Sequence, residues 1–375
     1  MTALLLIGGF VLLVAGGEVL VRGASTMARS FGLSPLVIGL TVVSFATSAP
    51  ELAVTARASL AGSPGLAVGN VVGSNIANIL LVIGVAGLIL PLAVRLPVVR
   101  RDVPVMIVLS LLMWGLSLQG DGVSRLDGGV LLALLIGYVA WAVIRSRQAQ
   151  SATEGKGRLT HAPGPGGGRP VLLALLLVVV GVAMLVLGAQ WLVDAATEIA
   201  LALGMSEMVV GLTIVAVGTS LPELATSVIA AIRGNVEMAV GNAVGSCIFN
   251  IGAVMGLAAV ITPGGVPVEA SALRFDLPVM VAVAVALLPI AFTGFTIKRW
   301  EAGLFLAYYT AYVVFLLLNS AQHAVLDQFS SVMLLFVLPL TGLTLALLAT
   351  YEIGLRRGRG QPLLDDGAGE DGAER

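Results

Sequence analysis

Long, uninterrupted apolar runs fill most of the chain, and short polar stretches separate them. A helix needs about 20 mainly apolar residues to cross a bilayer core of roughly 30 Å, and these runs are long enough. Because their apolar residues are continuous and do not alternate with polar ones, they predict helices and not the strands of a membrane barrel. The pattern therefore predicts an all-α, multi-pass membrane protein. The first ten runs lie near residues 3–21, 33–60, 64–91, 103–118, 127–144, 170–193, 205–232, 236–262, 276–295 and 300–319.

Two polar segments interrupt this pattern and divide the chain. A Gly- and Pro-rich stretch at 147–169 separates a first block, 1–146, from a second block, 170–319, and is predicted to be a linker. An eleventh apolar run follows and predicts an additional C-terminal transmembrane helix at 329–350. The charged tail at 355–375 is expected to be disordered.

Basic residues are distributed unevenly over the connections between the runs. If the N-terminus lies outside, seventeen Lys and Arg residues lie on the inner side and three, Arg57, Arg125 and Arg274, on the outer side. Inner loops of membrane proteins are enriched in Lys and Arg, so we expect the linker and the C-terminus to be cytoplasmic. The expected location is the plasma membrane, or the inner membrane of a Gram-negative cell.

Composition agrees with a lipid-facing surface and excludes several classes of protein. Hydrophobic residues make up 58% of the chain and charged residues 11%, where about 25% is typical of soluble domains. The net charge of −1 provides no basic field for nucleic acid. The single cysteine, Cys247, excludes an internal disulfide and a cysteine-based zinc or iron–sulfur site. No nucleophile–base pair or cofactor motif is present, so we expect neither an enzyme nor a resident cofactor.

The two blocks repeat one another with a constant shift of 172 residues. GLTVVSFATSAPELA at 39–53 aligns with GLTIVAVGTSLPELA at 211–225, and AVGNVVGSNIANI at 67–79 aligns with AVGNAVGSCIFNI at 239–251. Each block carries five runs, and an odd number of crossings inverts the second copy in the membrane. Inverted repeats place a substrate site near the membrane mid-plane, where the repeats meet. Apolar packing alone would not retain the same polar residues in both copies.

The first repeated motif, Thr-Ser-x-Pro-Glu, puts a carboxylate deep inside an apolar run. Thr and Ser precede Glu by four and three residues, so the three side chains share one helical face. An ionisable side chain at this depth costs at least about 2.5 kcal/mol and is a functional candidate by default. The candidates in the two copies are Thr47, Ser48, Glu51, Thr219, Ser220 and Glu223.

The proline of this motif adds backbone carbonyls to the candidate set. Pro50 and Pro222 have no N–H and therefore cannot bond the carbonyl four residues earlier. Those carbonyls belong to Ala46 and Gly218 and are free to serve as ligands.

The second repeated motif, Gly-Asn-x-x-Gly-Ser-x-x-x-Asn, forms a polar stripe because its polar residues recur every four positions. Ser74, Asn78, Ser246 and Asn250 are candidate ligands. For the first asparagine of each copy, Asn70 and Asn242, a role as polar contact between helices is an equally good interpretation.

All of these groups are hard oxygen ligands, which suit Ca²⁺, Mg²⁺ or Na⁺ and not Zn²⁺ or Cu⁺. Two carboxylates that lie close together in a low dielectric ionise together only when cations or protons compensate their charge. Competing cations would use the same carboxylates in turn, which favours exchange over free leak. A cation channel or a membrane scaffold is the alternative from a different class.

The motifs resemble the α-repeats of the sodium/calcium exchanger family, within the cation/Ca²⁺ antiporter superfamily. GLTVVSFATSAPE with GNVVGSNIAN, and GLTIVAVGTSLPE with GNAVGSCIFN, carry the resemblance, and GDGVSRLDG at 120–128 is similar to a microbial member. The resemblance covers about residues 3–319. It implies ten helices in two inverted five-helix repeats, with the first helix of each half sliding over the other eight. The eleventh helix does not belong to that pattern.

The resemblance also implies a role for each candidate residue. Glu51 and Glu223 would be shared Ca²⁺ and Na⁺ ligands, and Asn78 and Asn250 would complete the centre. Flanking sodium sites would use the side chains of Thr47, Ser48, Ser74, Thr219, Ser220 and Ser246, with the carbonyls of Ala46 and Gly218. Asn250 stands where potassium-dependent relatives have Asp, which argues against a K⁺ requirement.

The implied activity is secondary active antiport of Na⁺ against Ca²⁺ by alternating access. An H⁺/Ca²⁺ antiporter that uses the same two glutamates remains an alternative, because carboxylates bind protons as well as cations.

Overall fold

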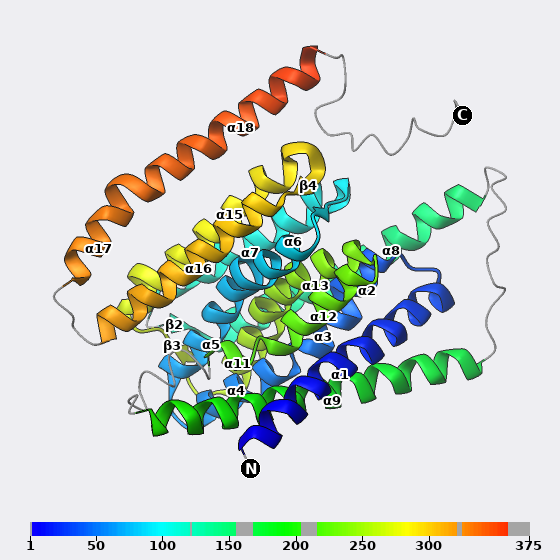
Figure 1. The fold of residues 1–375 in the computed structure, drawn as a ribbon, viewed down its shortest axis with the longest axis horizontal. Helices are drawn as coiled ribbons and strands as arrows, with labels where there is room; N and C mark the ends of the chain where they lie inside the picture. Colours follow the sequence, from blue (N-terminus) through cyan, green and yellow to red (C-terminus); the bar gives the residue numbers. More distant parts are fainter. Residues whose placement is uncertain (1, 121, 155–167, 204–215, 321–324, 359–375) are drawn as a thin grey trace.

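The computed structural model describes residues 2–120, 122–154, 168–203, 216–320 and 325–358. Within these ranges, nine helices are long and apolar enough to cross a membrane, and a bent pair of helices forms a tenth span. The counterpart of this bent pair in the second block is described only in part, as a shorter apolar helix, because residues 204–215 lie outside the described ranges. The predicted all-α, multi-pass membrane protein is confirmed (Figure 1).

The helices of the two blocks follow the same order, and several are joined in line by a π-helical segment, labelled η. The first block contains α1 (Thr2–Phe31), α2 (Pro35–Ile38), η1 (Gly39–Val43), α3 (Ser44–Thr47), α4 (Ala49–Leu60), α5 (Pro64–Ala77), η2 (Asn78–Ile83), α6 (Gly84–Ile89), β1 (Leu92–Ala93), η3 (Val98–Asp102), α7 (Val103–Leu118), β2 (Gly122–Val123) and α8 (Arg125–Glu154). The second contains α9 (Gly168–Ala202), α11 (Ala216–Gly218), α12 (Leu221–Ile232), α13 (Val236–Phe249), η5 (Asn250–Met255), α14 (Gly256–Ile261), β3 (Val266–Pro267), η6 (Ala272–Asp276), α15 (Leu277–Phe292), the 3₁₀ segment η7 (Thr293–Phe295), β4 (Thr296–Ile297) and α16 (Arg299–Ser320). The C-terminal elements are α17 (Leu326–Val332), η8 (Met333–Val337) and α18 (Leu338–Gly358).

The helix boundaries near the predicted linker differ from the sequence-based expectation. Helix α8 continues to Glu154, past the expected start of the linker, because this stretch consists largely of Arg, Gln, Ala and Glu, which favour helix. The rest of the predicted linker up to 167, and the tail from 359 onward, lie outside the described residues. The division of the chain into domains stays a prediction.

Two short antiparallel strand pairs connect the blocks at opposite ends of the helix bundle (Figure 1). Strand β1 pairs with β4, and β2 pairs with β3, so each pair takes one strand from each block. Strands β1 and β3 follow the second motif in their own blocks, and β2 and β4 precede the last helix of each block. Exchanging the two blocks therefore converts one pair into the other, as inverted repeats require.

The centre of the bundle is formed by the two continuous spans that carry the second motif. Most residues of these spans, Pro64–Ile89 and Val236–Ile261, are buried inside the protein. Helices α3 and η1 of the first block pack on α13 of the second, and α12 of the second block packs on η2 of the first. The two repeats thus meet along the helices that carry the candidate ligands.

Helices α1 and α9 pack on each other along one side of the bundle (Figure 1). Gly9 and Gly16 of α1 recur as Gly181 and Gly188 in α9, where they face one another. A Cβ atom on Gly16 would lie 3.0 Å from the Gly181 carbonyl oxygen, and one on Gly9 would lie 2.9 Å from that of Gly188. The seven-residue spacing keeps these glycines on one helical face, so the two backbones touch directly. The resemblance implied such a pair from the first helix of each block.

The additional C-terminal helix is also confirmed. Segments α17, η8 and α18 together form a span on the side of the bundle opposite α1 and α9 (Figure 1). Helix α18 packs on α15, and the Tyr308 hydroxyl of α16 forms a hydrogen bond with the Thr341 hydroxyl. Most of the remaining surface of this span is exposed and apolar, as expected of a helix that faces lipid.

Candidate cation-binding site

Two serines stand where the helices of the first motif break. Ser48 has φ −80° and ψ 4° and separates the segments Pro35–Thr47 and Ala49–Leu60, whose axes differ by 44°. Ser220 has nearly the same angles, φ −89° and ψ 3°, just before α12. Pro50 and Pro222 occupy the first turns of α4 and α12, where a missing N–H is tolerated. The motif therefore ends one helix and begins another at the same place in both repeats.

The carbonyl groups of Ala46 and Gly218 lie just before these breaks. The α-helical donor for each would be the N–H of the residue four positions later, which is proline in both repeats. Gly218 is buried against α9, and a Cβ atom at this position would lie 2.2 Å from Val193 Cγ2. A larger residue at this position would therefore force the Val193 side chain of α9 to shift, whereas Ala46 is only partly buried.

Two carboxylates lie beside each other just after the breaks. Glu51 and Glu223 are in the first turns of α4 and α12, have no exposed surface and interact electrostatically with each other. The Glu223 carboxylate lies beside Thr47 and Ser48, which belong to the other repeat. The Glu51 carboxylate lies beside the Ser74 hydroxyl. None of these contacts has hydrogen-bond geometry. The two carboxylates therefore lie in one region without a hydrogen-bond partner among the described residues.

Most of the predicted ligands carry buried polar atoms without a hydrogen-bond partner among the described residues. Leaving such an atom unsatisfied costs about 1–3 kcal/mol, so a concentration of them indicates a place built for a bound species. The eight side chains are Ser48, Glu51, Ser74, Asn78, Ser220, Glu223, Ser246 and Asn250. They belong to helices that pack together, since α4 contacts η5, α12 contacts η2 and α3 contacts α13.

The chemistry of this set matches hard cations. Within the described part of the chain, no group of three or more His, Cys, Asp or Glu side chains is placed to hold a metal ion. The set instead combines two carboxylates with hydroxyl, amide and carbonyl oxygens, which are the ligands that Ca²⁺ and Na⁺ prefer. Cys247 is buried, and its thiol lies 3.6 Å from the carbonyl oxygen of Asn75, so it acts as a small packing residue.

The two asparagines of the set each begin a π-helical segment. Asn78 is the first residue of η2, and Asn250 is the first residue of η5. π-Helical turns inside long helices are rare and occur frequently at functional sites. The runs at 64–91 and 236–262 predicted helices here, but local residue patterns carry no signal for a single wider turn.

Thr47 and Thr219 differ from the other predicted ligands because their hydroxyl groups have partners. Thr47 Oγ1 lies 3.3 Å from Asn242 Oδ1 and 3.4 Å from the Ser44 carbonyl oxygen. Thr219 Oγ1 lies 3.4 Å from Asn70 Oδ1. Each threonine thus contacts the first asparagine of the other repeat's second motif. Sequence analysis had left the role of these two asparagines open.

Comparison with known proteins agrees with this architecture. A family profile described as "Sodium/calcium exchanger protein" matches residues 1–144 and 173–318. The chain is 34% identical over 346 residues to "Sodium/calcium exchanger MaX1" of Methanosarcina acetivorans, covering 84% of this chain and 97% of that protein. It is 41% identical over 291 residues to "Inner membrane protein YrbG" of Escherichia coli, covering 76% and 88%.

A solved structure of the sodium-calcium exchanger NCX_Mj, soaked with 2.5 mM Na⁺ and 1 mM Sr²⁺, superimposes on this fold with a TM-score of 0.71. The two sequences are 33% identical, and the match covers 84% of this chain and 97% of the other. The fold, the repeated motifs and the sequence match agree over both blocks. The protein therefore belongs to the sodium/calcium exchanger family, a family of cation/Ca²⁺ antiporters.

Proposed function

We propose that this protein exchanges Na⁺ for Ca²⁺ across the membrane by alternating access, with Glu51 and Glu223 as ligands that both ions share. The observation that carries the proposal is the convergence of these two fully buried, unpaired carboxylates among neutral oxygen ligands. Their combined charge of −2 matches one Ca²⁺ or two Na⁺ ions. Binding of Ca²⁺ therefore excludes binding of the two Na⁺ ions, because two carboxylates cannot neutralise both at once in a low dielectric.

The proposed ligands include neutral oxygens on both sides of the carboxylates. Ca²⁺ takes six to eight oxygen ligands, and two glutamates with neighbouring carbonyls approach that number. Na⁺ has half the charge and is satisfied by hydroxyl, amide and carbonyl oxygens with a smaller share of carboxylate. The full proposed set is Ala46, Thr47, Ser48, Glu51, Ser74, Asn78, Gly218, Thr219, Ser220, Glu223, Ser246 and Asn250.

The proposed orientation places the N-terminus outside and the linker and C-terminus in the cytoplasm. The end of the bundle with the β1–β4 pair is rich in basic residues, namely Arg95, Arg100, Arg101, Lys298 and Arg299. The end with the β2–β3 pair has Arg125 next to it. Enrichment of Lys and Arg on the cytoplasmic side of membrane proteins supports this orientation. The location we propose is the plasma membrane, or the inner membrane of a Gram-negative cell.

The counter-ion is tested by ⁴⁵Ca²⁺ uptake into proteoliposomes that contain the purified protein. We expect uptake when the liposomes are loaded with Na⁺ and diluted into Na⁺-free medium at the same pH on both sides. We expect none when K⁺ or choline replaces Na⁺, with or without a pH gradient. Uptake driven by a pH gradient in the absence of Na⁺ would show instead that the protein is an H⁺/Ca²⁺ antiporter.

A further inference from the structure

Asn70 and Asn242 each connect three groups around the proposed site. Asn70 Nδ2 donates to the Glu51 carbonyl oxygen at 3.2 Å and to Thr55 Oγ1 at 2.9 Å, both on α4. Its Oδ1 accepts from Thr219 Oγ1, which belongs to the other repeat. The side chain therefore connects α4, the helix that carries Glu51 (the glutamate helix of its own repeat), with the helix break next to Thr219 in the opposite repeat.

Asn242 makes the same three contacts with the two repeats exchanged. Its Nδ2 donates to the Glu223 carbonyl oxygen at 3.4 Å and to Ser227 Oγ at 3.0 Å, and its Oδ1 accepts from Thr47 Oγ1 at 3.3 Å. Asn242 is fully buried. A contact between two helices alone would not require an amide that is bonded at three points in both copies.

The amide geometry explains why these positions carry asparagine. Both Nδ2 hydrogens point to acceptors on the glutamate helix, so Oδ1 must face the threonine across the repeat interface. A threonine hydroxyl that donates its hydrogen to Oδ1 presents oxygen lone pairs, and not that hydrogen, to a cation. Without the asparagine, the hydroxyl hydrogen would turn to other acceptors, which for Thr47 include the Ser44 carbonyl oxygen at 3.4 Å, and the threonine oxygen would lose its fixed orientation.

We propose that Asn70 and Asn242 are positioning residues that orient the hydroxyls of Thr219 and Thr47 as cation ligands and couple each glutamate helix to the break of the opposite repeat. The proposal rests on the proposed function, because it concerns the same site. It extends that function by assigning a role to residues that do not themselves ligate an ion.

The test is a set of double mutants that compares true partners with mismatched ones. We expect Asn242→Ala and Thr47→Val each to raise the half-saturating Na⁺ concentration about tenfold, because both remove the hydrogen bond between Asn242 Oδ1 and Thr47 Oγ1 that orients the threonine oxygen. The matched double mutant should be no worse than either single mutant. In the mismatched double mutant, Asn70→Ala with Thr47→Val, the half-saturating Na⁺ concentration should be about a hundredfold above that of the wild type, since independent effects multiply.

Two further measurements separate positioning from loss of folding. Thr47→Ser keeps the hydroxyl and should raise the half-saturating Na⁺ concentration less than Thr47→Val does. Ca²⁺/Ca²⁺ exchange needs no Na⁺ and reports whether each variant is folded and active. The inference would be overturned if the effects on the half-saturating Na⁺ concentration multiplied equally in the matched and mismatched double mutants. An unchanged Na⁺ dependence in Asn242→Ala would also overturn it. A wild-type protein without Na⁺-driven uptake would instead overturn the proposed function.

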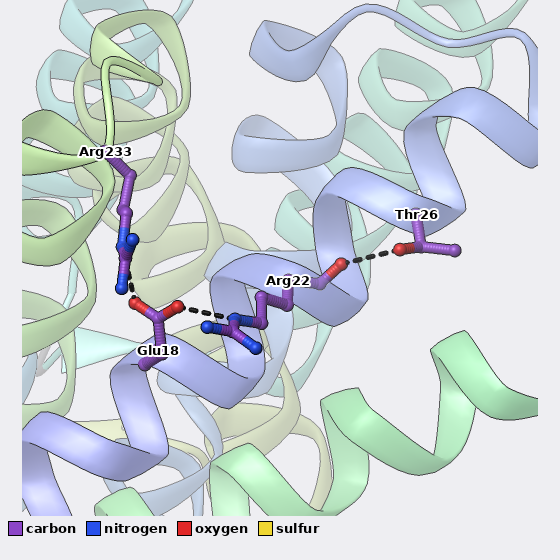
Figure 2. Close-up of polar contacts among 4 residues, drawn as sticks. All are labelled: Glu18, Arg22, Thr26 and Arg233. Atoms are coloured by element: carbon purple, nitrogen blue, oxygen red, sulfur yellow. Dashed lines mark hydrogen bonds and ion pairs between the residues drawn. The ribbon is translucent and has the colours of Figure 1, made fainter.

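A different observation concerns an ion-pair cluster between α1 and the end of α12 (Figure 2). Glu18 of α1 pairs with Arg22, one turn further along the same helix, and with Arg233, which follows α12. The distance from Glu18 Oε2 to Arg233 Nε is 2.8 Å. This second pair links one helix of the α1–α9 pair to the helix that carries Glu223.

The repeat gives the opposite half no equivalent of this ion pair. The partner position of Glu18 is Gln190, and that of Arg233 is Ala61. Helix α1 also packs along α12, whereas α9 and α4, both fully described, form no comparable contact. The structure is thus asymmetric, and its inverted counterpart, in which α9 lies along α4, would lack the ion pair.

We infer that the Glu18–Arg233 pair selectively stabilises the conformation in which α1 lies against α12. Arg233 is more than half exposed, with a side-chain accessibility of 55%, so its effect is modest. We expect Glu18→Gln and Arg233→Gln each to shift the ratio of half-saturating Ca²⁺ concentrations at the two membrane faces by about two- to fivefold, in the same direction. The double mutant should shift this ratio no further.

Arg22→Gln is the matched control for this inference. It removes an ion pair between two residues of α1, whose contact does not depend on where α1 lies against α12, so the ratio should stay at the wild-type value. An unchanged ratio in Glu18→Gln and Arg233→Gln, or an equal shift in Arg22→Gln, would contradict the inference. The ratio is measured in proteoliposomes after the sidedness of the protein has been determined by proteolysis.

Discussion

Replacing Glu51 or Glu223 with Gln is expected to reduce Na⁺-driven ⁴⁵Ca²⁺ uptake to background, a loss of at least about a hundredfold. Each substitution lowers the charge of the proposed site from −2 to −1, which can no longer neutralise Ca²⁺. It also replaces an oxygen ligand with an amide nitrogen that presents two hydrogens. Both carboxylates are fully buried and lack hydrogen-bond partners among the described residues, so no nearby group compensates.

Gln has nearly the shape of Glu, so both variants should still fold and elute as a single species in gel filtration. Glu198→Gln is the matched control, because Glu198 is exposed near the end of α9 and lies outside the proposed ligand set. Its uptake should equal that of the wild type. Uptake within twofold of the wild type in either Glu51→Gln or Glu223→Gln would exclude these residues as essential ligands.

The second large effect is expected at the contact between α1 and α9. In Gly181→Ala, the new Cβ atom would lie 2.6 Å from the Leu20 backbone nitrogen and 2.9 Å from the Gly16 carbonyl oxygen. Backbone atoms cannot rotate away as a side chain can, so the two helices must separate. Overpacking typically costs about 1–3 kcal/mol, and a clash with backbone belongs at the upper end of that range. We expect a melting temperature lowered by several degrees and uptake below about one tenth of the wild type.

Gly137→Ala on α8 provides a control with the opposite sign. Gly137 is exposed, and apart from its chain neighbours and the surrounding backbone of α8, no described atom lies within 4 Å of the position that its Cβ would take. Since Ala favours helix over Gly by up to about 1 kcal/mol, this variant should melt at or above the wild-type temperature. If Gly181→Ala melted at the wild-type temperature with full uptake, direct backbone contact between α1 and α9 would be disproved. Thermal stability is measured by the loss of the gel-filtration peak after heating.

The predicted transmembrane elements agree with the structure because the bilayer imposes their length. Every predicted run lies on a helix wherever the chain is described, including the additional C-terminal span. The ends of helices were less predictable. Helix α8 continues to Glu154 because local helix propensity, and not the membrane, determines where it ends.

The candidate site was predictable to the extent that the repeat made it visible. Glu51 and Glu223 stand out because a charge in an apolar run is costly. Its recurrence at the equivalent position of the second repeat shows that it is not a chance occurrence. The role of Asn70 and Asn242 was not predictable in this way. A buried amide has the same appearance in a sequence whether it joins two helices or orients a ligand.

The sequence by itself determined the helical type of the spans and, where the chain is described, their positions, together with the inverted duplication and the two buried carboxylates. These follow from bilayer thickness, from the odd number of spans in each block and from the cost of a charge in lipid. Only the tertiary structure decided which groups meet: Thr47 with Asn242, Thr219 with Asn70, and Glu18 with Arg233. These partners are 195, 149 and 215 residues apart, and their contact depends on the register between packed helices, which no local pattern encodes.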